Sequence, residues 1–141
     1  MYFVQKGWKA HLVWVRAVQG EILDVVVDIR EDSPTFGKSF SIRLSAANKK
    51  QLFVPRGFAH GYVVLSDTAI FAYKCDNLYS KESEGGILYD DAKLKIDWQL
   101  DLEKILLSEK DAILPAFGEH RAFKKAWGNC WIVILLNCYT V

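Results

Sequence analysis

The sequence predicts an all-β domain in which short strands, separated by turns, pack as a sandwich or a barrel. Apolar residues recur at every second position in several stretches, and small clusters of glycine, proline, aspartate and serine interrupt these stretches. Short strands at this spacing are typical of double-sheet β folds. Helical patterns are scarce, and the best candidates are one turn near residues 80–84 and a segment near residues 118–127.

The expected strands follow one another along the first half of the chain. In residues 21–29, four apolar side chains alternate on one face, whereas Asp24 and Asp28 point the other way. The further strands are expected at residues 12–18, 39–44, 52–55, 61–65 and 69–74. Phe40, Ile42 and Leu44 are expected to face inward. The last two strands are expected to form a hairpin across residues 66–68.

The C-terminal stretch differs from the rest. Residues 131–141 are more apolar than any segment before them and show little alternation, which fits either a buried strand or an oligomer contact. A third possibility is a tail unrelated to the rest of the fold. We therefore expect one domain over residues 1–117, followed by a tail of unknown role over residues 118–141.

Composition narrows the function classes. The 141 residues are 51% apolar and carry a net charge of +1, so nucleic acid is a poor default partner. The longest apolar run, residues 131–136, is too short to span a bilayer. The residues that follow Met1 show no pattern of a secretory signal. The three cysteines form no CxxC pair. A reduced cytoplasmic setting without membrane attachment is therefore expected.

The residues that carry chemistry begin with a Pro55-x-Gly57-x-x-His60 pattern. The proline and glycine allow a tight turn, and the histidine enters the next strand. Tyr73 follows thirteen residues later in a second apolar run, so an imidazole and a phenol are expected to line one cavity. His60 alone fits a structural, hydrogen-bonded histidine equally well. A metal site is disfavoured because only three histidines are present and they form no HxH pair.

Longer motifs occur in a fixed order and carry a family resemblance. They are VVVDIR at residues 25–30, DSPTFGK at 32–38, GFAHG at 57–61, YKC at 73–75, IDW at 96–98 and LSEKD at 107–111. Together they resemble the dTDP-4-dehydrorhamnose 3,5-epimerase family over about residues 5–117. The resemblance implies a cupin-like double-sheet jelly roll and a homodimer. It also implies proton abstraction and return at C3 and C5 of a dTDP-4-keto-6-deoxyhexose, in dTDP-L-rhamnose synthesis, without metal or nicotinamide cofactor.

The resemblance also implies roles for single residues. Tyr73 matches the acid, and Asp111 matches the aspartate that holds the catalytic base. His60 matches a substrate-binding histidine, and Tyr79 matches the aromatic residue that stacks on thymine. Glu84 and Lys110 match nucleotide-binding or sugar-binding positions.

Two positions depart from the family pattern. The catalytic histidine is expected at Phe3 and the enolate-stabilising lysine at Val13, and neither side chain can do that work. His11 is a conceivable but poor substitute for the base. The chain is therefore expected to be an N-terminally truncated member with impaired activity. The alternative is a non-catalytic protein that binds nucleotide sugars on the same scaffold.

Overall fold

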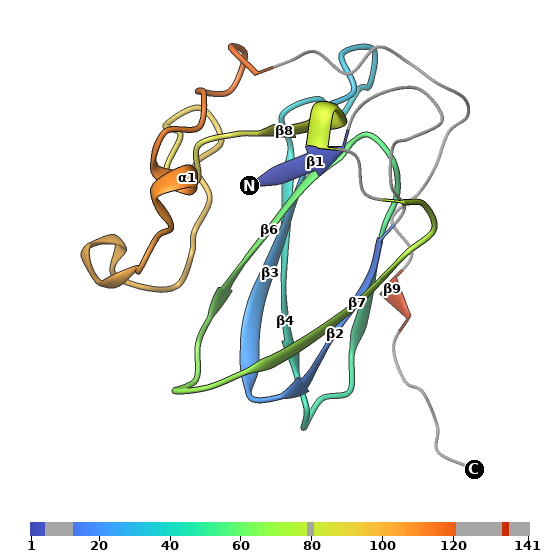
Figure 1. The fold of residues 1–141 in the computed structure, drawn as a ribbon, viewed down its shortest axis with the longest axis vertical. Coiled ribbons are helices and arrows are strands. Elements are labelled where there is room, and N and C mark those ends of the chain that lie inside the picture. Colours follow the sequence, from blue (N-terminus) through green and yellow to red (C-terminus); the bar gives the residue numbers. More distant parts are fainter. Residues whose placement is uncertain (5–12, 79–80, 121–133, 136–141) are drawn as a thin grey trace.

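The computed structural model consists of two antiparallel sheets that pack face to face, with very little helix (Figure 1). It describes residues 1–4, 13–78, 81–120 and 134–135. The five-stranded sheet has the order β4-β3-β6-β1-β8. Its strands are β1 (Tyr2–Val4), β3 (Glu21–Asp28), β4 (Ser39–Ser45), β6 (Phe58–Val64) and β8 (Glu84–Gly86). This arrangement confirms the cupin-like jelly roll expected from the sequence.

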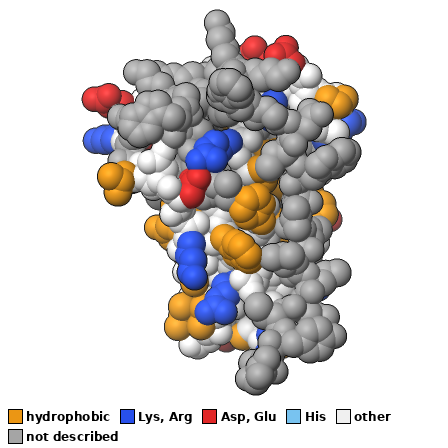
Figure 2. Space-filling view, turned by 90° about the vertical axis from the view of Figure 1, so that its right-hand side faces the viewer, with side chains coloured by type: hydrophobic (Ala, Val, Ile, Leu, Met, Phe, Trp, Pro, Cys, Tyr) orange, Lys and Arg blue, Asp and Glu red, His pale blue; other side chains and the backbone are white. Residues whose placement is uncertain are grey.

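The four-stranded sheet has the order β7-β2-β5-β9. Its strands are β2 (Val13–Gln19), β5 (Gln51–Val54), β7 (Ile70–Cys75) and β9 (Ile134–Leu135). Only β9 represents the apolar C-terminal stretch among the described residues, and it pairs with β5 at the edge of this sheet. In Figure 2, hydrophobic side chains gather on the side of the molecule that carries β7 and β9, with lysine and arginine side chains beside them.

Strand β3 packs against other parts of the protein on both faces, so seven of its eight residues are buried from solvent. Ile22 and Val26 pack in the core between the two sheets, together with Val15 and Leu44. The opposite face contributes to a second core, whose members include Leu23, Val25, Val27, Ile87 and Trp98. The segment at residues 87–117 therefore forms an outer layer over the five-stranded sheet (Figure 1). Asp24 and Asp28 point away from this layer, as expected, and so into the space between the sheets.

The expected hairpin at residues 61–74 is wrong. Strand β6 pairs with β3 in one sheet, whereas β7 pairs with β2 in the other. The turn between them is tied to the corner between β2 and β3: Leu65 N donates to Glu21 O, and Glu21 N donates to Ser66 Oγ. The β2–β3 connection and the β6–β7 connection therefore lie next to each other, and each leads from one sheet to the other. Gly20 makes the contact possible, because it has φ 71° and a Cβ there would lie 2.1 Å from Thr68 O.

Among the residues that the structure describes, helical structure is limited to three short elements: η2 (Lys81–Ser83), η3 (Leu102–Lys104) and α1 (Glu109–Ala112). The first confirms the turn expected near residues 80–84. In the second expected segment, residues 118–120 are not helical, and residues 121–127 lie outside the described residues. Helix α1 was not predicted, although Ser108 caps it by accepting from Asp111 N. None of the described helices is long and apolar enough to cross a membrane.

Candidate active site

The site centres on an imidazole and a carboxylate in the space between the sheets. His60 lies on β6, and Asp24 lies on the neighbouring strand β3. His60 Nε2 is 2.9 Å from one carboxylate oxygen of Asp24 and 3.0 Å from the other. Asp24 is fully buried, whereas the His60 side chain keeps 17% of its surface exposed. The carboxylate is therefore screened from water while the imidazole remains reachable.

Burial dominates the electrostatics of this pair. It raises the pKa of Asp24, and the electrostatic interaction and hydrogen bond with His60 lower that pKa without cancelling the increase. Sequence reasoning did not assign Asp24 to the site. The available signal was a pair of acids, Asp24 and Asp28, on one face of an otherwise apolar strand.

Aromatic side chains extend from this pair towards β7 on the facing sheet. Phe71 lies 6.3 Å from the His60 ring and stacks on Tyr62 at 4.4 Å. Tyr73 follows at 6.1 Å from Phe71. In register, Tyr73 lies opposite Val15 and Phe71 opposite Ala17, so both belong to the inner face of their sheet.

Tyr73 nevertheless has 64% of its surface exposed. The expectation that His60 and Tyr73 line one cavity therefore stays a prediction, because no described contact joins the two side chains directly. Tyr73 lies at the open rim, and Phe71 separates its ring from the imidazole. The phenol is in contact with solvent, while the imidazole lies deeper between the sheets.

The expected nucleotide-binding residues gather at β8 and α1. Lys110 Nζ donates to Glu84 Oε2 at 2.9 Å, which joins the helix to the edge strand. Asp111 follows Lys110 in α1, and its carboxylate accepts from Ser108 Oγ at 2.6 Å. The described contacts thus bring Glu84 and Lys110 together and assign Asp111 to the helix cap. Tyr79 lies outside the described residues.

Metal ligation finds no support in the described part of the chain. There, no three histidine, cysteine, aspartate or glutamate side chains gather closely enough to hold an ion. The His60–Asp24 pair provides only two side chains that could bind a metal, one imidazole and one carboxylate. Its geometry suits proton transfer better, because a carboxylate that holds an imidazole is a recurrent arrangement in general base catalysis.

Comparison with known proteins identifies the family. A sequence model described as dTDP-4-dehydrorhamnose 3,5-epimerase matches residues 3–119. The chain belongs to this family. A Salmonella typhimurium dTDP-4-dehydrorhamnose 3,5-epimerase is 50% identical over 115 residues, which are 82% of this chain and 62% of that protein. The Shigella flexneri enzyme is 56% identical over 97 residues, which are 69% of this chain and 52% of the relative.

Solved structures of the epimerase family agree with the fold. The Elizabethkingia anophelis enzyme superimposes with a TM-score of 0.80 at 53% identity, over 83% of this chain and 64% of that chain. A Legionella pneumophila epimerase in complex with dTDP-4-keto-L-rhamnose superimposes with a TM-score of 0.76 at 43% identity, over 84% of this chain and 68% of that chain. The chain spans between about half and two thirds of the length of the curated relatives named above.

The two positions that depart from the epimerase pattern have different surroundings. Phe3 lies in β1 opposite Gly85, and its neighbour Tyr2 is the residue paired with His60. Val13 begins β2 opposite Cys75 and packs against the core between the sheets. His11, the alternative base considered from sequence, lies outside the described residues.

Proposed function

We propose that this chain is a nucleotide-sugar epimerase that inverts C3 and C5 of a dTDP-4-keto-6-deoxyhexose. One observation carries the proposal. An imidazole–carboxylate pair on β6 and β3 faces the sheet whose inner side bears the Tyr73 phenol. Inversion of a carbon requires proton removal from one side and proton delivery to the other, so groups on two facing sheets suit the reaction.

The family relatives support the choice of substrate. The Legionella relative was solved with dTDP-4-keto-L-rhamnose, and a Bacillus anthracis relative was solved with TDP and PPi bound. Protons at C3 and C5 lie next to the C4 ketone, so removing one gives an enolate. This chemistry needs neither a metal nor a nicotinamide, and we propose that the chain uses none.

The nucleotide end of the substrate is proposed to bind near β8 and α1. Lys110 supplies positive charge for the diphosphate, and Glu84 orients the lysine through their ion pair. Tyr79, two residues before η2 begins at Lys81, is proposed to stack on the thymine ring. Stacking requires only a flat aromatic face, which a tyrosine provides.

Replacing Tyr79 with alanine is expected to weaken thymidine diphosphate binding by about 1–3 kcal/mol, the range seen when base–aromatic stacking is removed. Calorimetry on the parent chain and the variant measures the difference. Tyr79→Phe is the matched control and should retain the affinity, because it keeps the ring. Equal affinities for all three proteins would show that the base binds elsewhere.

Solvent deuterium incorporation into dTDP-4-keto-6-deoxyglucose tests the activity directly. We expect deuterium to appear at C3 or C5 in the presence of the chain, because enolisation exchanges these protons with solvent. Mass spectrometry and proton NMR identify the exchanged carbon. Thymidine diphosphate binding without any exchange would refute the epimerase proposal and favour a non-catalytic sugar-nucleotide-binding protein.

We further propose a homodimer in a cytoplasmic setting. The family resemblance supports the dimer, and so does the half-exposed apolar surface of β2, where Trp14 and Val18 are 38% and 47% exposed. Light scattering at micromolar concentration separates a dimer from a monomer.

A further inference from the structure

The hydrogen-bond pattern around His60 defines which ring nitrogen can act. Both oxygens of Asp24 lie within 3.0 Å of Nε2. When Asp24 is ionised its carboxylate only accepts hydrogen bonds, and in that state Nε2 carries the proton and Nδ1 presents its lone pair. Within the described residues, no hydrogen bond involves Nδ1. Asp24 thus holds the imidazole through one nitrogen, and the side chain as a whole keeps 17% of its surface exposed.

Stability alone gives no reason for this pair. Burying a carboxylate costs free energy, and well-packed apolar side chains of similar volume are often at least as stabilising as a buried ion pair. Apolar neighbours are plentiful here, because Ile22 and Val26 flank Asp24 on the same face of β3. A buried carboxylate that holds a partly exposed imidazole is a pattern found at functional sites.

We propose that His60, oriented by Asp24, is the group that removes the substrate proton in this chain, an inference that rests on the proposed epimerase function. His60 is then a catalytic residue and not only a substrate-binding one, and Asp24 is its positioning residue. Phe3, at the position where the family resemblance expects the base, has no group that accepts a proton. Among the described residues, His60 is an imidazole on the strand that pairs with β1, directly opposite Tyr2, the neighbour of Phe3.

The proton and electron balance of the step is complete with these groups. The C–H bond next to the C4 ketone breaks, and its electron pair forms the carbon–carbon double bond of an enolate whose charge rests on O4. The proton moves to His60 Nδ1, and the Asp24 carboxylate stabilises the resulting imidazolium. Tyr73 Oη–H then delivers a proton to the opposite face of the carbon. The ketone re-forms, the exposed phenolate regains a proton from solvent, and His60 releases its own.

His60→Asn tests the base, since asparagine can still hydrogen-bond Asp24 but cannot accept the substrate proton. We expect deuterium incorporation to fall by about 10²–10⁴-fold, the usual range for a lost general base. His120→Asn is the matched control: His120 is also buried, but it stacks on Phe117 in the outer core, and its loss should leave the rate within a few-fold.

Chemical rescue separates the base from a structural role. In His60→Ala, added imidazole should restore part of the exchange in proportion to its concentration. For Asp24→Asn, kcat should fall more than KM rises, and rescue should weaken in the double variant Asp24→Asn/His60→Ala. A purely structural pair would instead lower the folded fraction, which circular dichroism measures, without any response to imidazole.

The outcomes distinguish the two proposals. If His60→Asn exchanged the substrate protons at a rate within a few-fold of the parent chain, the assignment of the base would be overturned. The epimerase function would remain intact. Loss of exchange in His11→Asn but not in His60→Asn would overturn it in favour of His11. No exchange by the parent chain at all would refute the proposed function itself, and the base assignment with it.

Discussion

Replacing Trp98 with alanine is expected to lower the free energy of unfolding by about 3–5 kcal/mol, the usual cost of deleting a buried aromatic side chain. Trp98 is only 5% exposed and packs with Leu23, Val25 and Val27 in the core beneath the outer layer. Its Nε1 also donates to Tyr89 O at 2.9 Å. The indole therefore holds an irregular segment to the five-stranded sheet by both packing and a hydrogen bond. Urea denaturation measures the loss.

Two control variants separate these contributions. Trp98→Phe keeps a ring in the core but leaves Tyr89 O without its donor, so we expect a smaller loss of about 1–3 kcal/mol. Leu106→Ala changes a side chain of the same segment that is 99% exposed, and it should cost less than about 0.5 kcal/mol. A Trp98→Ala loss no larger than that of Leu106→Ala would mean that the outer layer contributes little to stability.

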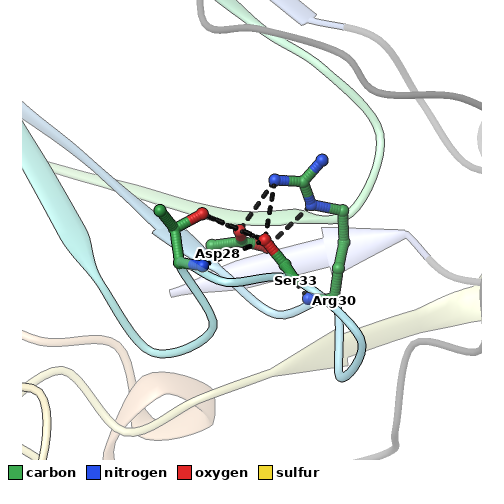
Figure 3. A network of polar contacts seen from close by, with 4 residues as sticks. Asp28, Arg30 and Ser33 are labelled. Atoms are coloured by element: carbon green, nitrogen blue, oxygen red, sulfur yellow. Dashed lines mark hydrogen bonds and ion pairs between the residues drawn. The ribbon is translucent and has the colours of Figure 1, made fainter.

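The second large effect is expected at Asp28, the carboxylate at the end of β3 (Figure 3). Arg30 donates to both of its oxygens, at 2.8 and 2.7 Å, and Ser33 Oγ and Thr35 Oγ1 each donate at 2.6 Å. Burial alone would raise the pKa of Asp28. The hydrogen bonds outweigh burial and lower the pKa from 3.8 to about 2.

Asp28→Asn removes this charge while nearly preserving the shape. Because the folded-state pKa is depressed, the stabilisation is fully present above the unfolded value near 4 and is lost as pH falls through 2. The difference of nearly two units between the unfolded and folded pKa of Asp28 corresponds to about 2 kcal/mol of folding free energy. We therefore expect the variant to be less stable by about 2 kcal/mol at pH 7 and equal to the parent below pH 2.

Denaturation curves between pH 2 and pH 7 check this expectation. Asp32→Asn serves as the control, since Asp32 is an exposed carboxylate in the same turn. Parallel stability curves for the parent chain and Asp28→Asn would contradict the assignment of the acid-sensitive stability to Asp28. The result also bears on the site, because Ile29 N donates to Gly57 O and the Arg30 guanidinium lies 4.8 Å from the Phe58 ring centroid. This turn therefore anchors the start of β6, the strand that carries His60.

The sequence by itself determined the fold class, most strand positions and the family. Alternation along residues 21–29 correctly separated the two faces of β3, because side chains on a strand alternate whatever the strand pairs with. Ordered motifs predicted the epimerase family, and the family comparison confirmed it. Helix α1 was also encoded locally, in the cap from Ser108 to Asp111, although it was not predicted.

Tertiary structure decided which strands pair and which side chains meet. The hairpin expected at residues 61–74 failed because the corner at Gly20 and Glu21 holds the turn so that the chain crosses between sheets. The role of Asp24 depends on His60, 36 residues away, and sequence periodicity records a shared face but not a distant partner. Exposure of Tyr73 likewise follows from its place at the rim of the sheets. Local patterns reflect forces between near neighbours, whereas the site results from contacts between residues far apart in the chain.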